Sequence, residues 1–68
     1  MTPLDVISET LRLGQPAHRA LAGAGIVTFA DLALWRRADV AALHGIGPSA
    51  FPRLLEALLA RGLTFAAP

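Results

Sequence analysis

The stretch ALHGIGPSAF, residues 42–51, decides the fold that this sequence predicts. Two glycines enclose an isoleucine, and Pro-Ser-Ala follows at once, which is typical of the start of a helix. Glycine adopts backbone conformations that other residues avoid, so Gly45 and Gly47 predict a tight turn between two helices. Such a turn, followed at once by a helix N-terminus, gathers backbone N–H groups that bind anions. The stretch therefore has two interpretations, a phosphate-binding turn or a purely structural connection.

The segment after the turn predicts the longest helix of the chain. Its apolar residues follow the i, i+3, i+4, i+7, i+8 spacing of a buried helix face: Phe51, Leu54, Leu55, Leu58 and Leu59. With Pro48 as the first helical residue, we expect this helix to reach about Arg61 and to end at Gly62. Pro52 conflicts with that start, because a proline near the fifth position removes a hydrogen bond inside the helix. The alternatives are a distorted first turn or a later start, with Ser49 as the capping residue.

Shorter helices are predicted before the turn. They cover about residues 16–22, 29–35 and 38–43. Thr28 and Asp31 have the spacing of a capping box at the start of the second. Arg36 and Arg37 are expected at its end, where cations interact favourably with the helix dipole. A further helix over about residues 3–10 is an alternative to a frayed N-terminal arm. No segment has the alternation of a strand, so the sequence predicts an all-α bundle of four to five short helices.

Size and charge limit the functions that this chain can have. It has 68 residues, no cysteine, six arginines, no lysine and five acidic residues, which leaves a net charge of +1. One small domain without disulfides is expected. A charge of +1 is not that of a strongly electrostatic DNA-binding protein, so any nucleic-acid role must rest on local geometry. No segment resembles a signal peptide or a membrane span, and we expect a cytoplasmic protein.

The sequence contains no pattern typical of an enzyme or a metal site. His18 and His44 have no acidic residue or cysteine at ligand spacing. Ser49 has no base and orienting acid placed near it, as a nucleophile requires. We therefore expect a binding protein and not an enzyme.

The run Gly45-Ile46-Gly47-Pro48-Ser49-Ala50 resembles the hairpin of helix-hairpin-helix DNA-binding modules and is similar to that of DNA polymerase beta. In that family the hairpin glycines and the amides after the proline hold a DNA phosphate. Carried over by position, the phosphate contacts are the amides of Gly45, Gly47, Ser49 and Ala50. Flanking charge or hydrogen bonds are expected from His44, Arg19 and Arg53. The resemblance also implies a monovalent cation, potassium or sodium, on the carbonyls of Ala41, Leu43 and Ile46.

A second resemblance covers residues 11–65. This part is similar to the C-terminal domain of the bacterial RNA polymerase alpha subunit and to small bacterial proteins of that shape. The matching residues are Leu13, Leu21, Ala24-Gly25-Ile26, Leu32, Leu43, Gly47 and Arg61-Gly62-Leu63. Pro16 stands where that domain has its minor-groove arginine, and Arg19 where it has an asparagine. Pro48 and Ser49 replace its basic residues. The resemblance therefore implies the fold, and the specific DNA contacts of that domain do not carry over.

These observations predict one tandem helix-hairpin-helix-like domain over residues 1–68. It consists of an N-terminal arm or short helix (1–12), a degenerate hairpin (13–27), a connecting helix (28–37), an intact hairpin (38–62) and a tail (63–68). The predicted function is weak, non-sequence-specific DNA binding through backbone phosphate. The alternative is a protein-interaction module or homodimer of the same fold that does not bind DNA. The charge of +1, the missing basic residues and Pro52 favour that alternative, as does the high apolar content.

Overall fold

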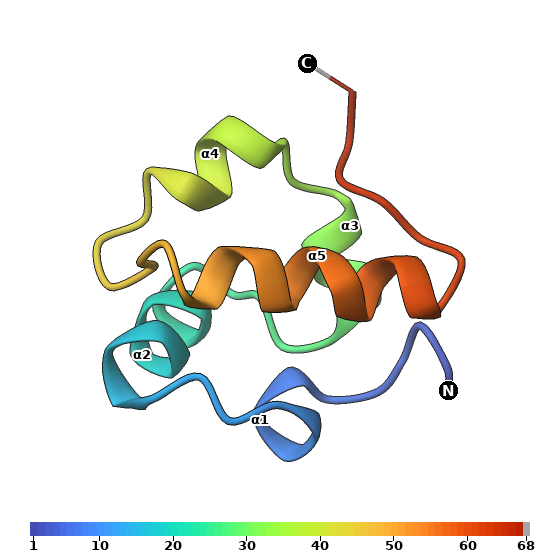
Figure 1. The fold of residues 1–68 in the computed structure, drawn as a ribbon, viewed down its shortest axis with the longest axis horizontal. Helices are drawn as coiled ribbons and strands as arrows, with labels where there is room; N and C mark the ends of the chain where they lie inside the picture. Colours follow the sequence, from blue (N-terminus) through green and yellow to red (C-terminus); the bar gives the residue numbers. More distant parts are fainter. Residues whose placement is uncertain (68) are drawn as a thin grey trace.

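The glycine turn leads into a central helix, and the other helices are arranged around it (Figure 1). A computed structural model describes residues 1–67 of the chain. Its helices are α1 (Ile7–Thr10), α2 (Gln15–Gly23), α3 (Phe29–Ala33), α4 (Arg37–Ala41) and α5 (Ala50–Ala60). In Figure 1, α4 lies above α5, and α1 and α2 lie below it, while α3 contacts α5. Residues 1–67 form isolated bridges but no strand, so the predicted all-α class is confirmed.

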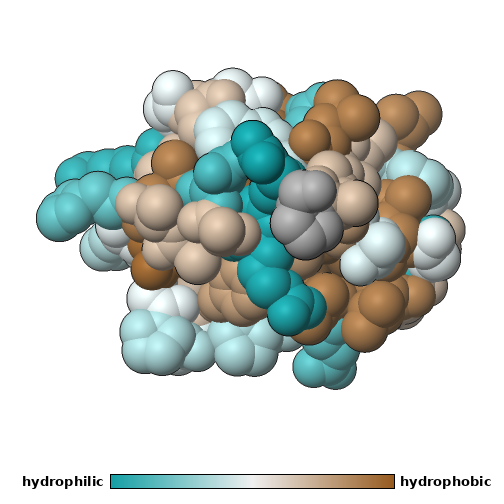
Figure 2. Space-filling view, turned by 90° about the horizontal axis from the view of Figure 1, so that it is seen from above, coloured by the Kyte–Doolittle hydropathy of each residue, from teal (hydrophilic) through white to brown (hydrophobic). Residues whose placement is uncertain are grey.

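Every helix contributes side chains to one core. The fully buried large side chains are Ile7, Phe29, Leu32, Val40, Leu54 and Leu58. Burying each such side chain stabilises the fold by about 1.5–3 kcal/mol. The predicted inner face of α5 is correct for Leu54 and Leu58 and wrong for Leu59, whose side chain is 60% exposed. On the side of α4 and the C-terminal segment, a hydrophilic band crosses the surface between hydrophobic areas (Figure 2).

α5 begins at Ala50, two residues later than the start predicted at Pro48. Pro52 is therefore the third residue of the helix. The first amides of a helix have no partner inside it, so a proline there removes no hydrogen bond. The alternative of a later start is confirmed, although the side chain of Ser49 makes no capping hydrogen bond.

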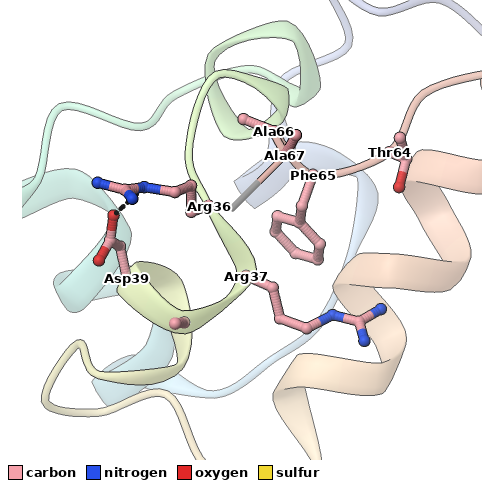
Figure 3. A pocket seen from close by; sticks show the side chains of 8 residues that line it. Arg36, Arg37, Asp39, Thr64, Phe65, Ala66 and Ala67 are labelled. Atoms are coloured by element: carbon pink, nitrogen blue, oxygen red, sulfur yellow. Dashed lines mark ion pairs between the residues drawn. The ribbon is translucent and has the colours of Figure 1, made fainter.

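The boundary between α3 and α4 corrects the role predicted for the two adjacent arginines. The capping box of Thr28 and Asp31 is present, but α3 ends at Ala33. Arg36 is the N-cap residue of α4 and Arg37 is its first residue, so they begin a helix instead of closing one. Arg36 pairs with Asp39 at 3.4 Å (Figure 3), which places an acidic group in the first turn of α4.

The C-terminal segment explains this boundary. The amide of Ala66 donates to the carbonyl of Trp35 at 2.9 Å, and Arg36 forms a bridge with Ala66. That pairing requires extended backbone at Arg36, where φ is −77° and ψ is 148°. Phe65 is buried beside it, as expected for a tail that folds back. Pro68, the last residue of the predicted tail, lies outside the described residues.

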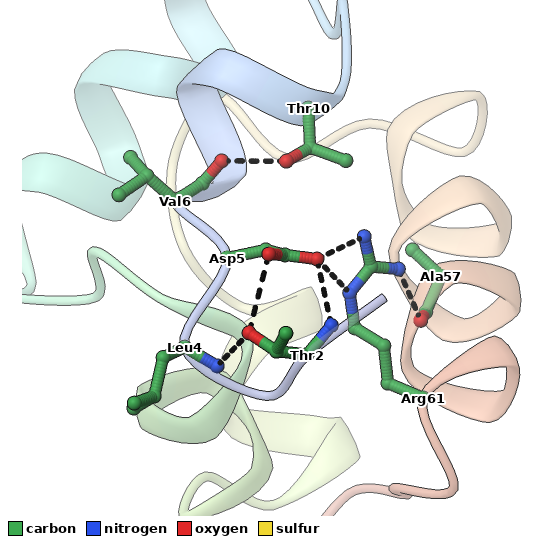
Figure 4. Close-up of polar contacts among 7 residues, drawn as sticks. All are labelled: Thr2, Leu4, Asp5, Val6, Thr10, Ala57 and Arg61. Atoms are coloured by element: carbon green, nitrogen blue, oxygen red, sulfur yellow. Dashed lines mark hydrogen bonds and ion pairs between the residues drawn. The ribbon is translucent and has the colours of Figure 1, made fainter.

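The N-terminal segment forms a turn where the sequence predicts the start of a helix. The amide and the hydroxyl of Thr2 both donate to the carboxylate of Asp5, at 3.0 and 3.2 Å (Figure 4). α1 begins only at Ile7, because the segment before it runs beside the start of α3. There the carbonyl of Pro3 accepts from the amide of Ala30 at 2.7 Å, and the amide of Ile7 donates to the carbonyl of Val27 at 3.0 Å.

Arg61 joins this N-terminal segment to α3 and α5. Its side chain is 4% exposed, and its Nε and Nη2 donate to Asp5 Oδ2 at 3.2 and 3.0 Å (Figure 4). Its Nη1 donates to the carbonyl of Ala57, and its guanidinium lies 4.1 Å from the ring centre of Phe29. The hydrogen bond from Thr2 and the contact with Arg61 hold the pKa of Asp5 below its usual value. Arg61 is therefore structural and unavailable to a ligand.

Candidate nucleic-acid interface

Three of the predicted phosphate-binding amides lie in the turn formed by residues 42–49, between α4 and α5, and the fourth belongs to Ala50, the first residue of α5. Two local hydrogen-bonding patterns shape it. The amide of Ile46 donates to the carbonyl of Leu43 at 3.1 Å. The amides of Ala50 and Phe51 both donate to the carbonyl of Gly47, each at 3.2 Å. The turn is thus a defined backbone structure that leads directly into α5.

Gly45 is required by the packing of the turn against α2. Its φ is +105°, a conformation that side chains disfavour. A Cβ atom at this position would lie 2.4 Å from the carbonyl oxygen of Pro16 and 3.4 Å from the Cβ of Ala20. The turn therefore approaches the first two turns of α2 so closely that only glycine fits. This requirement exists whether or not the turn binds a ligand.

Gly47 differs, because nothing in the fold requires a glycine there. Its φ is not among the positive values of the chain, and a Cβ atom would meet no other atom within 4 Å. The backbone at Gly47 is thus approachable from outside. A ligand that needs close contact with the main chain provides a reason for a glycine at this position.

Three of the four predicted phosphate-binding amides are free to donate. Within residues 1–67, the N–H groups of Gly45, Gly47 and Ser49 have no hydrogen-bond acceptor. The amide of Ala50 is already engaged with the carbonyl of Gly47, and Pro48 has no N–H group. Free backbone amides grouped in one turn form the kind of concavity that binds anions.

The structure brings two of the predicted basic residues to the region around this turn. Arg19 is exposed on α2, directly before Ala20, which faces Gly45. Arg53 lies in the first turns of α5 and donates from Nη1 to the carbonyl of Arg12. His44 is exposed and adjoins Gly45.

Arg12 is an addition that the sequence did not suggest, since 41 positions separate it from its partner on α5. Its side chain is exposed, and it has no carboxylate at ion-pair distance among the described residues. The same holds for Arg19 and Arg53. By contrast, Arg36 is paired with Asp39. The arginines without an acidic partner therefore include three on the segments around the turn.

The predicted cation ligands are carbonyls of this same region. The carbonyl of Leu43 accepts from the amide of Ile46, and a carbonyl oxygen has a second lone pair for another contact. The carbonyls of Ala41 and Ile46 accept no such bond outside the helices among residues 1–67. The monovalent cation stays a prediction.

Neither histidine belongs to a cluster of ligating side chains. No group of three or more His, Cys, Asp or Glu side chains within residues 1–67 is placed to hold a metal ion. His18 Nε2 accepts a hydrogen bond from the amide of Leu13 at 3.3 Å, which fixes the segment before α2. Over the described part of the chain, no helix has the length and apolar character that crossing a membrane requires.

No protein-family profile, no curated protein and no solved structure matches this chain.

Proposed function

We propose that this chain binds DNA without sequence specificity, by holding a backbone phosphate on the amides of Gly45, Gly47 and Ser49. The observation that carries the proposal is that these amides have no acceptor within residues 1–67. One of the three residues, Gly47, is a glycine that the fold does not require. Hydrogen bonds from backbone amides to phosphate position a protein on DNA and carry no base information. In this proposal the chain is a binding module and not an enzyme.

The proposal extends to the fold. α4, the turn and α5 are the intact hairpin of a helix-hairpin-helix module, and the segment from Pro16 to Val27 is its degenerate counterpart. The resemblance to helix-hairpin-helix proteins supports this assignment, as does the order of helix, glycine turn and helix in both α2–α3 and α4–α5.

Charge around the turn supplies the remaining contacts. Arg19 and Arg53 reach further phosphates, and His44 adds a hydrogen bond beside Gly45. Arg12, held next to Arg53 through its carbonyl, joins this set. Few phosphates are neutralised, so affinity is weak and falls with salt. We expect a dissociation constant on the order of micromolar or weaker, as for non-specific DNA binding in general.

The test is an NMR titration of ¹⁵N-labelled protein with a short DNA duplex at about 50 and about 200 mM salt, the range over which phosphate contacts weaken strongly. We expect the amide signals of Gly45, Gly47 and Ser49 to shift at low salt and to return at high salt. Signals of these amides that stay unchanged at low salt, in a folded protein, would contradict the proposal.

Gly47→Ala is the sharpest variant, because its methyl group meets no protein atom and occupies the space that a phosphate needs. We expect DNA affinity to fall at least about tenfold, the effect of losing one hydrogen bond to a charged group. Gly23→Ala is the matched control. A Cβ at Gly23 also meets nothing, and this glycine ends α2 outside the turn. Its affinity should equal that of the wild type.

The charge contribution is tested by a second pair of variants. Arg19→Gln should reduce the slope of log affinity against log salt by about one, since one phosphate contact is lost. Arg36→Gln removes the same charge from a residue that pairs with Asp39. Equal effects of the two variants would show that net charge, and not the turn, governs binding.

A second candidate function rests on exposed apolar side chains. Leu4 and Leu34 are 72% and 80% exposed. The bond between the carbonyl of Pro3 and the amide of Ala30 brings the segment of Leu4 beside α3, and Leu34 follows Ala30 by four residues. An exposed apolar patch of this kind favours a protein interface or a homodimer. Sedimentation equilibrium of the wild type and of Leu34→Gln tests it: self-association that the variant abolishes supports this candidate, and a monomer at millimolar concentration contradicts the homodimer.

A further inference from the structure

A pocket of about 620 Å³ lies between the start of α4 and the C-terminal segment. Residues 36–39 form one wall and residues 64–67 the other (Figure 3). The pocket is at the first residues of α4, whereas the turn of residues 42–49 follows the last. It is therefore separate from the phosphate site proposed above. Its volume is within the range of about 300–1,000 Å³ that is usual for small-molecule sites.

An aromatic pair makes one part of this pocket apolar and rigid. Phe65 is buried and stacks on Phe51, with ring centres 5.2 Å apart and planes at 11°. The hydrogen bond from Ala66 to Trp35 holds the backbone next to Phe65. In Figure 3 the ring of Phe65 lies between the C-terminal segment and Arg37. A ligand in the pocket thus meets a fixed aromatic and alanine surface.

The two arginines of the pocket differ in their partners. Arg36 is paired with Asp39 at 3.4 Å. Arg37 has its guanidinium 5.9 Å from the ring centre of Phe51, and it has no carboxylate at ion-pair distance within residues 1–67. Contact with an aromatic face orients a guanidinium and leaves its N–H groups free. Arg37 therefore supplies an unused, planar set of donors at the edge of an apolar pocket.

We propose that this pocket binds a small organic carboxylate, with the carboxylate on the guanidinium of Arg37 and the apolar body against Phe65. The planar fork of an arginine matches the two oxygens of a carboxylate. Among the described residues that line the pocket, Arg37 is the charged group without an acidic partner, and it selects one negative group. The apolar part of the lining selects an uncharged body. The proposal does not depend on DNA binding.

The experiment is an NMR titration of ¹⁵N-labelled full-length protein with 4-phenylbutyrate, a carboxylate with an aromatic body. We expect saturable shifts confined to the amides of residues 36–39 and 64–67. The neutral analogue 4-phenylbutanamide is the ligand control and should bind at least about tenfold more weakly, because its contact with arginine carries no charge. No saturation up to about 20 mM carboxylate, a concentration about twenty times a dissociation constant of 1 mM, would overturn the proposal.

Arg37→Gln tests the residue itself. This exposed side chain contributes little to the core, so we expect the variant to fold, and its ¹⁵N spectrum checks this. We expect at least about a tenfold loss of carboxylate affinity and no change for the amide. Arg19→Gln, which removes an exposed arginine from α2, should leave both affinities unchanged. Equal carboxylate binding by Arg37→Gln and the wild type would overturn the proposal, as would equal losses in both variants.

Discussion

The two glycine turns of this chain differ in what happens to their backbone amides. In the turn after α2, every backbone amide from Ala24 to Ala30 donates a hydrogen bond to an acceptor within the protein. Gly25 and Ile26 donate to Ala22 and Leu21 at 3.0 and 2.9 Å, which is the Schellman arrangement at a helix end. In the turn before α5, the amides of Gly45, Gly47 and Ser49 have none within residues 1–67. The fold satisfies the amides of the first turn, and it leaves these three amides of the second turn without a partner among the described residues.

Two neighbours close the first turn. The carboxylate of Asp31 accepts from the amides of Val27 and Thr28, at 3.1 and 3.0 Å. The N-terminal segment takes the next two amides through the carbonyls of Asp5 and Pro3. The second turn has no acidic residue in its sequence, and its contact with α2 at Pro16 and Ala20 provides no acceptor for these three amides among residues 1–67. Half-buried amides without partners are uncommon in proteins, so those of Gly45 and Gly47 are a reason to look for a ligand. Ser49 is exposed, and its amide adds a third donor beside them.

Gly45→Ala should have the largest effect on stability and should break the second turn. We expect a loss of about 3 kcal/mol, because the strain of a positive φ adds to a clash with the carbonyl of Pro16. Urea unfolding followed by the fluorescence of Trp35 measures it. Gly47→Ala, with no clash and no positive φ, is the control and should stay within about 0.5 kcal/mol of the wild type. A midpoint for Gly45→Ala equal to that control would contradict the contact with α2.

Arg61→Met should cause the next largest loss of stability. It should loosen the N-terminal segment that packs against the turn after α2. The apolar stem is kept, and the cation–π contact with Phe29 is lost, which alone has a value of about 2 kcal/mol when desolvated. The N-terminal segment then loses its link to α5 through Asp5. Hydrogen exchange should become faster at Ile7 and Ala30, whose bonds join that segment to α3. Unchanged exchange at these two amides would show that Arg61 does not hold the segment.

Gly25→Ala sharpens the comparison with Gly45. Both glycines have positive φ, but a Cβ at Gly25 meets nothing within 4 Å. Only the conformational strain remains, so we expect a loss of about 1 kcal/mol in the same urea experiment. The difference between the two alanine variants measures the close approach to Pro16. If Gly25→Ala lost as much unfolding free energy as Gly45→Ala, backbone strain alone would explain both losses.

Lowering the pH should weaken the hydrogen bonds that Asp31 accepts in the turn after α2, and it should leave the turn before α5 unchanged. Hydrogen bonds from Thr28 and Val27 lower the pKa of Asp31 from 3.8, its value in the unfolded chain. A carboxylate with a lowered pKa in the folded state stabilises the protein above pH 3.8, and this contribution is lost as the pH falls through the lowered pKa. The amide signals of Val27 and Thr28 should therefore titrate below pH 3.8, and those of Gly45 and Gly47 should not.

Asp31→Asn is the control for this titration, because its amide group does not ionise in that range. The signals of Val27 and Thr28 should then be independent of pH around the Asp31 transition. A titration that persists in Asp31→Asn would assign the change to another group, such as Asp5, whose pKa is also lowered.

Local patterns in the sequence predicted the parts of the structure that depend on neighbours in the chain. The capping box of Thr28 and Asp31 is present, and so is the predicted glycine after α5, Gly62, which has a positive φ and follows the C-cap Arg61. They involve residues at most five positions apart, so a short stretch of sequence contains the whole interaction. The place of Arg36 at the end of the preceding helix was predicted wrongly, because Ala66, 30 positions away, pairs with Arg36.

The sequence by itself determined the helical class, the approximate helices, the caps and the existence of a glycine turn before α5. Only the tertiary structure decided which glycine the packing needs, which amides have no partner within residues 1–67, and which groups the arginine side chains contact. Gly45 meets Pro16, Arg61 meets Asp5, and Arg53 meets the carbonyl of Arg12, across separations of 29, 56 and 41 positions. A hydrogen bond or a close contact depends on where both partners lie in space, and for residues so far apart only the packed core sets that distance.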